Sequence, residues 1–389
     1  MGGDAIFVGY LADELARRGH EVHVAYSPSV YSILRGELKG GAEADANMPV
    51  QRHEFRPLSG RMSLFLNLAL GTDLRSKNWV KAEIKSLHPD VVHWHNTKGF
   101  VSRPFTVNAS HSLYTAHDYY SICPRSNLLR PGEIICEEPR LCQTCLIRWA
   151  KPPQLWRVGK RAVIDFPRGT KILCPSEYMA DRLRKEGVPV HSVLRGFVPD
   201  PGKAASDNAD RKETILFVGI LEKRKGPQTL LRAFIDGREH HGFKLVMVGE
   251  GPLKEPLKAE VAASGVGDRV TIPGFIPRKE LESLLREASL MVVPSEWPEN
   301  APSTALEAFS FGVPVLGTSL GGLPEMLSPE SGSIIVEPGN PRAIGDTLAM
   351  LWDDRKYLHR RGQMARKTYD ERFSPQAHIT AYMKIIDGK

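Results

Sequence analysis

Two halves of this chain repeat the same alternation of short strand-like runs and helical patterns. From Asp90 onward, β-branched runs such as DVVHWHN, SLYTAHD and KILCPS alternate with helical patterns. This alternation is typical of βαβ units, which form parallel sheets covered by helices on both faces. Each of these runs ends in polar residues, where ligands bind to such sheets. The pattern predicts an α/β fold with functional residues at the strand ends.

A polar segment divides the chain nearly in half. Residues 199–213, PDPGKAASDNADRKE, have almost no apolar side chain and predict a linker. Beyond them, strand runs from TILFVGI to SGSIIVE alternate with helices again. We therefore expect two Rossmann-like, doubly wound domains facing a central cleft, at 1–198 and 214–373. A last helix, in 374–389, could pack back on the first domain.

The first domain begins without the strand that normally opens this fold. Met1 is followed at once by Gly2, Gly3 and a helical pattern, so the strand expected in the middle of the sheet is missing. A start assigned too late, a shortened chain and a tolerated gap all explain this, and we favour the first. The strand EVHVAY follows the helix.

Composition restricts the location and the partners. The 389 residues hold 41% hydrophobic and 25% charged residues, and no apolar run is long enough to span a membrane. We expect a cytoplasmic protein. The net charge of +7 suits nucleotide phosphates or anionic lipids, but the basic clusters lack interleaved aromatics, so we expect no nucleic-acid partner. The stretch Arg61–Lys81 is amphipathic: it either covers a core or lies on the inner membrane surface as a peripheral anchor.

The strongest motif runs from residue 293 to 325, VPSEWPENAPSTALEAFSFGVPVLGTSLGGLPE. A strand ends in a polar loop, Pro302 stands at the expected first helical position, and the helix stops at Gly312. The unpaired N–H groups near Asn300 and Ala301 and the helix dipole predict a phosphate site. Glu299 and Glu307 flank it, and carboxylates suit such a place only if they accept hydrogen bonds from sugar hydroxyls.

This Glu-x7-Glu arrangement within PSxWxEN…LEAxxxGxPV resembles glycosyltransferase family four, the large family of retaining enzymes with the GT-B fold. The resemblance covers nearly the whole chain. The segments GGD…LADELARRGHEV, PDVVHWHN, TAHDYYSICPR, PSEYMADRLRKEGV, FVGILEKRKG, MVGEGP and PGFIP stand in the family's order. It implies a glycosyltransferase in which the second domain holds the donor.

The resemblance also assigns roles in donor binding. Glu307 would bind the ribose hydroxyls of the donor and Glu299 the transferred sugar. The remaining donor-binding positions are Gly2, Gly3, Gly219, Arg224, Lys225, Gly249, Phe275, Ile276, Asn300, Ala301 and Pro302. Of these, Phe275 and Ile276 would lie by the base, and Gly2 and Gly3 would close over the diphosphate.

Lys225 is the cation expected to reach the diphosphate. Negative charge develops on the leaving group during transfer, so a cation there stabilises the transition state more than the ground state. The family usually carries an arginine directly after the glycine of the preceding strand, where this chain has Ile220. Lys223 or Arg224 could supply the second cation.

Histidines end two strands of the first domain. By resemblance, His117 contacts the donor sugar near the reacting carbon and belongs with Lys225 and Glu299 as a catalytic residue. His93 and His95 alternate with Trp94, and His95 is the better candidate for contacting the acceptor.

We expect a retaining glycosyltransferase that moves a hexose-type sugar from a UDP- or GDP-sugar to a glycan or lipid-linked acceptor. The family is thought to act without a protein nucleophile, with the departing phosphate accepting the acceptor's proton. No Asp-x-Asp motif serves the donor, so we expect no catalytic metal. A non-catalytic nucleotide-sugar binder and another GT-B enzyme, such as a nucleotide-sugar epimerase, are the alternatives.

Four cysteines fall in one insertion, residues 119–150, and a branch of the same family is similar in this respect. They are Cys123, Cys136, Cys142 and Cys145, the last two forming a C-x2-C pair. Four thiolates suffice for a tetrahedral structural zinc. Free thiols are the second interpretation, and disulfides the third because the cytoplasm is reducing. The insertion follows His117, so we expect it to shape acceptor choice.

Overall fold

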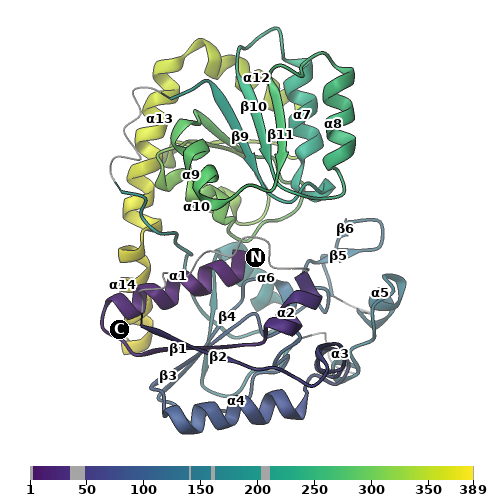
Figure 1. Ribbon diagram of the computed structural model, residues 1–389, viewed down its shortest axis with the longest axis vertical. Helices are drawn as coiled ribbons and strands as arrows, with labels where there is room; N and C mark the ends of the chain where they lie inside the picture. Colours follow the sequence, from purple (N-terminus) through teal and green to yellow (C-terminus); the bar gives the residue numbers. More distant parts are fainter. Residues whose placement is uncertain (1–2, 36–48, 140–141, 159–162, 203–210, 389) are drawn as a thin grey trace. The chain divides into compact units, whose positions relative to one another are not determined.

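The chain folds into two compact units (Figure 1). The structure, a computed structural model, describes residues 3–35, 49–139, 142–158, 163–202 and 211–388. The first unit comprises Met1–Leu194 and Tyr382–Lys389, and the second comprises Arg195–Ala381. The second crossing between the units falls inside the last helix, α14 (Pro375–Asp387).

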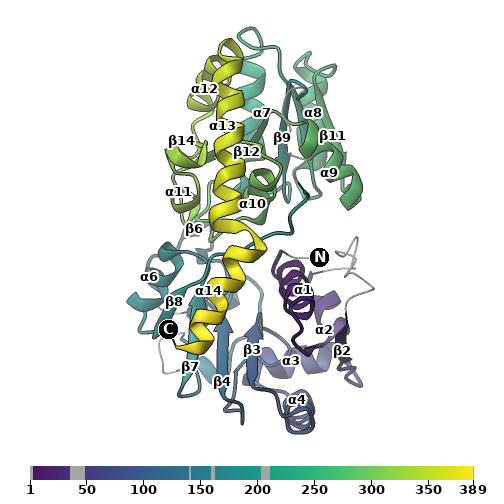
Figure 2. The same cartoon turned by 90° about the vertical axis from the view of Figure 1, so that its left-hand side faces the viewer.

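The first unit has its parallel strands in two separate sheets. β1 (Val22–Tyr26) pairs with β2 (Val50–Glu54), and a second sheet has the order β3-β4-β7-β8 (Figure 2). The members of the second sheet are β3 (Val91–His95), β4 (His111–Thr115), β7 (Thr170–Cys174) and β8 (Val190–Val193). In the described chain, no ladder joins β1 to β3. This is the unit in which the sequence lacks the expected mid-sheet strand.

Helices and a small hairpin complete the first unit. The helices are α1 (Gly3–Arg17), α2 (Pro28–Arg35), α3 (Gly60–Leu70), α4 (Leu74–Leu87), η1 (Tyr119–Ser121), α5 (Cys142–Arg148), η2 (Leu155–Arg157) and α6 (Glu177–Lys185). The antiparallel hairpin of β5 (Leu129–Arg130) and β6 (Ile134–Ile135) lies within the cysteine-bearing insertion.

The second unit is a six-stranded parallel sheet with the order β11-β10-β9-β12-β13-β14. Its strands are β9 (Thr214–Val218), β10 (Lys244–Val248), β11 (Val270–Gly274), β12 (Leu290–Val293), β13 (Val315–Thr318) and β14 (Ile334–Val336). This is the 3-2-1-4-5-6 order of a doubly wound dinucleotide-binding fold, so the predicted fold class is confirmed. The strand order reverses between β9 and β12.

Successive residues of each central strand enter opposite cores. Ile215 and Phe217 of β9 pack into one cluster with α7 (Pro227–Asp236) and α12 (Pro341–Asp353). Leu216 packs into the other cluster with α10 (Ser303–Ser310). The period of two along a strand, with apolar residues at every position, produces a sheet buried on both faces.

The other helices of the second unit are η4 (Lys223–Lys225), α8 (Lys254–Ala263), α9 (Arg278–Glu287), α11 (Leu323–Met326), η5 (Pro329–Ser331), α13 (Arg355–Thr368) and η6 (Tyr369–Phe373). Among the described helices, none is long and apolar enough to cross a membrane.

The unit boundary lies four residues earlier than the predicted domain end at 198. Val198 is 2% exposed and packs into the second unit's core, and its carbonyl accepts a hydrogen bond from Tyr369 at 2.9 Å. At the other end, Tyr382 packs with Leu113 and Leu194 in the first unit. Most of the predicted linker, residues 203–210, lies outside the described residues.

A tight backbone contact fixes the loop after β9. Gly226 has φ +68°, and a Cβ atom there would lie 2.0 Å from the carbonyl oxygen of Pro294, which follows β12. Only glycine allows both the left-handed conformation and this approach.

Replacing Gly226 with alanine should therefore destabilise the second unit by more than 2 kcal/mol, because a steric clash adds to backbone strain of about 1–2 kcal/mol. The matched control is Gly339→Ala, since Gly339 has φ +67° with no atom within 4 Å of an added Cβ. Urea unfolding of both variants measures the difference. Equal losses of stability would mean that the contact with Pro294 relaxes without cost.

Candidate functional site

The point where the strand order reverses places two loops side by side in the second unit. β9 and β12 are neighbours in the sheet, while the strands that follow them, β10 and β13, lie on opposite sides. The loops after β9 and β12 therefore diverge and leave a crevice at their carboxyl ends, the usual ligand site of this topology. Lys225 belongs to the first loop and Glu299 to the second.

Lys225 and Glu299 form an ion pair across this reversal point. Lys225 Nζ lies 2.6 Å from Glu299 Oε1, and the Ser295 hydroxyl donates to the same oxygen at 2.7 Å. Glu299 is only 5% exposed, so the charge-assisted hydrogen bonds offset the cost of its burial. Sequence reasoning named Lys225 and Glu299 but missed Ser295.

The backbone of Glu299 is held by the GGLPE segment. Gly322 N donates to Glu299 O at 2.6 Å, and a Cβ on Gly321 would lie 2.3 Å from that oxygen. The two glycines after β13 thus fix the carboxylate-bearing loop through close backbone contact.

The predicted glycines also bring strand ends together. Gly219 N donates to Val248 O at 3.0 Å, and a Cβ on Gly249 would lie 1.8 Å from Gly219 O. The ends of β9 and β10 therefore meet backbone to backbone, with no room for a side chain at Gly249.

Helix α10 begins directly beside the carboxylate loop. Pro302 is its N-cap and the helix starts at Ser303, one residue later than predicted, because Pro302 keeps an extended ψ of 120°. The positive end of the helix dipole and the first-turn N–H groups lie next to Asn300, which is 8% exposed, and the half-buried Ala301.

Glu307, inside α10, pairs with a residue that sequence reasoning missed. Arg278 Nη1 donates to Glu307 Oε1, and Arg278 Nε donates to Glu282 at 2.9 Å. Arg278 is the first residue of α9, where a positive side chain is unfavourable to the helix dipole. A basic residue at a helix start is the signal that could have revealed this carboxylate partner.

The two residues predicted to lie by the base behave differently. Phe275, directly after β11, is 48% exposed, and its N–H donates to Glu250 Oε1 at 3.1 Å. Ile276 packs against the second core. An exposed aromatic ring suits stacking on a base, whereas Ile276 is mainly part of the packing.

Arg224 is not brought to Glu299. It pairs with Glu222, and its guanidinium lies 5.1 Å from the ring centroid of Trp297, in the loop that carries Glu299. Ile220, at the position where an arginine was expected by resemblance, is 51% exposed. Among the described residues, Lys225 is therefore the cation that contacts Glu299.

In the first unit, two strand-end histidines meet. His95 Nδ1 lies 2.8 Å from His117 Nε2, while His93 bonds Thr115 Oγ1 at 2.8 Å and Tyr382 OH at 3.2 Å. The parallel pairing of β3 with β4 brings these ends together. His95 thus contacts His117, whereas His93 has a structural role.

Burial sets the charge of His117. It lowers the pKa of this imidazole, and the nearby Asp4 opposes the effect. Because the hydrogen bond between two imidazoles needs one donor and one acceptor, both rings cannot be protonated and keep it. A neutral His117 at pH 7 follows from both facts.

The start of α1 lies close to this pair. The Asn96 amide donates to Asp4, in the first turn, and the Phe7 ring meets His117 edge-on at 5.4 Å between centroids. Gly3 begins the helix, whereas Gly2 lies outside the described residues.

The four clustered cysteines lie near one another in the insertion. Burial raises the pKa of Cys142 to about 12, and Cys123, Cys136 and Cys145 add to the rise. In the described chain these are free thiols, and no group of three or more His, Cys, Asp or Glu side chains there is arranged to hold a metal ion. Structural zinc stays a prediction.

Comparison with known families and proteins accords with this geometry. Residues 1–200 match the family described as Glycosyltransferase Family 4, and residues 202–368 match Glycosyl transferases group 1. A D-inositol 3-phosphate glycosyltransferase of Corynebacterium glutamicum is 30% identical, over 94% of this chain and 86% of that protein.

Other similarities are more local or concern the fold. An uncharacterized glycosyltransferase of Methanocaldococcus jannaschii is 36% identical, but over 38% of this chain and 39% of its own length. The Anabaena protein HepE, solved in complex with UDP-glucose, has a TM-score of 0.65 at 15% identity, covering 100% of this chain and 97% of that one. With two family matches that together span most of the chain, this protein belongs to glycosyltransferase family 4.

Proposed function

We propose that the protein is a retaining glycosyltransferase that transfers a hexose-type sugar from a UDP- or GDP-sugar to a glycan or lipid-linked acceptor. The observation that carries this proposal is the ion pair between Lys225 and the buried Glu299 at the reversal point, beside the start of α10. It places a cation, a carboxylate and helix N–H groups at one strand edge, as a charged diphosphate joined to a sugar requires.

The ribose of the donor would bind at Glu307. Arg278 occupies Oε1 of this carboxylate, and an ionised carboxylate has about four acceptor positions. Two ribose hydroxyls can therefore bind without breaking the ion pair. The exposed ring of Phe275 would stack on the base.

The diphosphate would lie between Lys225 and the start of α10. Lys225 has three N–H bonds and donates one to Glu299. The others can reach phosphate oxygens, together with the helix N–H groups near Asn300. No divalent cation is needed in this arrangement, because lysine and helix dipole oppose the developing negative charge.

The transferred sugar would bind the second oxygen of Glu299. Lys225 and Ser295 both donate to Oε1, so Oε2 is directed to sugar hydroxyls. In the transfer, the bond from the anomeric carbon to the phosphate oxygen breaks and a bond to the acceptor oxygen forms on the same face. The acceptor's proton passes to the departing phosphate.

By the resemblance to the family, His117 would contact the donor sugar and His95 the acceptor. A neutral His117 can exchange a hydrogen bond with a sugar hydroxyl, and its bond to His95 fixes the ring. The complex of HepE with UDP-glucose supports a nucleotide-sugar donor for a protein of this fold. A nucleotide-sugar epimerase and a non-catalytic binder are the competing functions, and product analysis with and without an acceptor separates them from transfer.

Glu307→Gln should weaken binding of the preferred nucleoside diphosphate about 10- to 100-fold, because it removes charged hydrogen bonds of about 1.5–3 kcal/mol. Calorimetric titration with UDP and with GDP measures the affinity and identifies the base. The matched control is Glu282→Gln, which also removes a carboxylate that pairs with Arg278 but has no place in the ribose site. Equal effects of the two changes would contradict the assignment.

Lys225→Met should lower kcat for sugar transfer about 100- to 1000-fold, since the lost cation acts mainly in the transition state. Lys258→Met is the control, because Lys258 is exposed on α8 and has no place in the proposed site. Initial rates at saturating donor measure kcat, and the melting temperature reports any cost of leaving Glu299 buried without its cation. Wild-type turnover by a folded Lys225→Met protein would refute this role.

An inverted helix in the first unit suggests where a lipid-linked acceptor would be presented. α3 buries Ser63 and Asn67 while Met62 is 57% and Phe65 50% exposed. The donors of these buried side chains are bonded internally: the Ser63 hydroxyl donates to Asp73 at 2.7 Å, and the Asn67 amide nitrogen donates to Ser63 O. The apolar face of the helix is thus turned to solvent.

We propose that this face docks on an anionic membrane. Leu58, Leu70 and Leu74 are also at least half exposed around it. Arg61 and Arg75 are exposed on the same stretch and complement anionic headgroups. Peripheral binding would bring a lipid-linked acceptor to the enzyme from the inner face of the membrane.

Replacing Met62 and Phe65 with serine should reduce co-sedimentation with phosphatidylglycerol vesicles several-fold, because both side chains would lose apolar burial in the headgroup region. Met350→Ser removes an equally helical, 47% exposed methionine of the second unit and should leave sedimentation unchanged. Binding to pure phosphatidylcholine tests the electrostatic part. Undiminished sedimentation of the double variant would reject this surface.

A further inference from the structure

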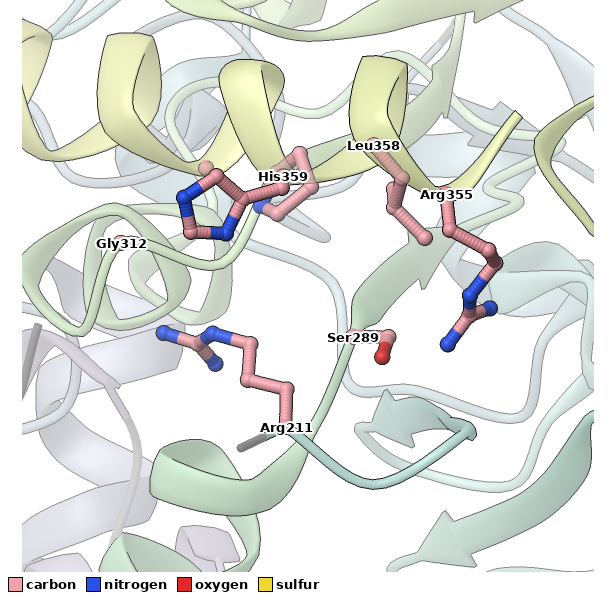
Figure 3. Close-up of a pocket in the computed structure, with 8 residues that line it drawn as sticks. Arg211, Ser289, Gly312, Arg355, Leu358 and His359 are labelled. Atoms are coloured by element: carbon pink, nitrogen blue, oxygen red, sulfur yellow. The ribbon is translucent and has the colours of Figure 1, made fainter. Parts of the chain in front are cut away.

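A polar cavity lies in the second unit where β9 and β12 begin, at the opposite ends of these strands from Lys225 and Glu299 (Figure 3). It has a volume of about 160 Å³, and its lining includes Arg211, Ser289, Arg355 and His359. A single water needs roughly 10–15 Å³ on the same measure, so the cavity has room for a larger group. Figure 3 shows Arg355 and Ser289 on one side and Arg211 and His359 on the other.

The cavity is separate from the candidate donor site. Ser289 directly precedes β12, and Arg211 lies three residues before β9. Lys225 and Glu299 follow the other ends of these two strands. At about 3.3 Å per residue, the four or five residues of a strand separate the two places by about 15 Å.

The lining carries positive charge without a carboxylate among its residues, which are Arg211, Ser289, Gly312, Pro314, Arg355, Leu358, His359 and Gly362. Burial lowers the pKa of Arg211 only to about 10, so this guanidinium stays charged at neutral pH. It donates hydrogen bonds to the carbonyls of Leu285, Ala288 and Phe311, and its charge adds to the positive field at the cavity.

One hydrogen-bond donor of Arg355 lacks an acceptor among the described residues. Its Nη1 is buried and has no hydrogen-bond partner among the described residues, while Nη2 lies 3.8 Å from Glu213 Oε1. A buried charged donor without a partner is unfavourable and calls for an acceptor. Arg355 also begins the 14-residue helix α13, whose positive dipole end adds to the same field.

We propose that this cavity is a binding site for a phosphate group. A tetrahedral oxyanion presents several acceptors, which match the Nη1 donor of Arg355 and the His359 ring from different directions. Arg211 contributes charge rather than hydrogen bonds. The phosphate is either the free ion or the phosphate of a monoester such as a sugar phosphate, and both present this chemistry. The proposal does not depend on the transferase activity.

The test compares two variants by calorimetric titration with inorganic phosphate and, separately, with glucose 6-phosphate. Arg355→Gln should weaken phosphate binding at least 10-fold, whereas Lys225→Met, at the donor site, should leave it unchanged. The opposite result, with binding lost in Lys225→Met and kept in Arg355→Gln, would show that phosphate binds at the donor site and overturn the proposal.

Arg355 also stacks near Phe243, with 5.0 Å from its guanidinium carbon to the ring centroid, so its loss could disturb folding. Arg355→Lys keeps the charge and removes the Nη1 donor, and His359→Ala removes the imidazole ring that lines the cavity. Both should weaken phosphate binding while the melting temperature without phosphate stays at the wild-type value. Tighter binding of glucose 6-phosphate than of phosphate would identify a monoester as the ligand. Millimolar or weaker binding of both that none of the variants changes would overturn the site.

Discussion

The double burial of the parallel sheet in the second unit determines where every loop of the site begins. Because Ile215 and Phe217 enter one core and Leu216 the other, β9 cannot slip by one residue without exchanging its buried faces. The register with β10 and β12 is thereby fixed, and so is the level at which each strand ends. Glycine contacts then hold the loops: Gly226 against Pro294, and Gly321 against the backbone of Glu299.

On this frame, each candidate carboxylate has a cation from a different element. Glu299, after β12, meets Lys225, after β9, and Glu307, in α10, meets Arg278, at the start of α9. Buried ion pairs contribute little net stability but leave a strongly unfavourable charge when one partner is lost. The pairs therefore keep two carboxylates ionised and oriented before a ligand binds, and a polar ligand can add hydrogen bonds to groups that are already in place.

The sequence was sufficient for features that depend on local pattern. The strand ending at His95, the strand after the linker and the fold class follow from periodicity, and the Glu299–Glu307 motif follows from strand and helix signals. Arg278 was missed because its partner is 29 residues away: a basic residue at a helix start signals that a carboxylate partner exists, but no local pattern says which carboxylate it is. Likewise, the inverted burial of α3 depends on Asp73, which accepts from Ser63 across a turn.

Arg211 ties together the far ends of the two helices that meet in the Arg278–Glu307 pair. Its guanidinium caps the carbonyls at the end of α9, at Leu285 and Ala288, and the carbonyl of Phe311 that follows α10. The start and the end of α9 are thus each tied to the second half of α10, and these contacts form a closed frame. A frame of this kind resists sliding of one helix along the other, because a shift at either end must break contacts at both. The position of Glu307 is therefore set partly by Arg211, which lies where the strands of the sheet begin rather than where they end.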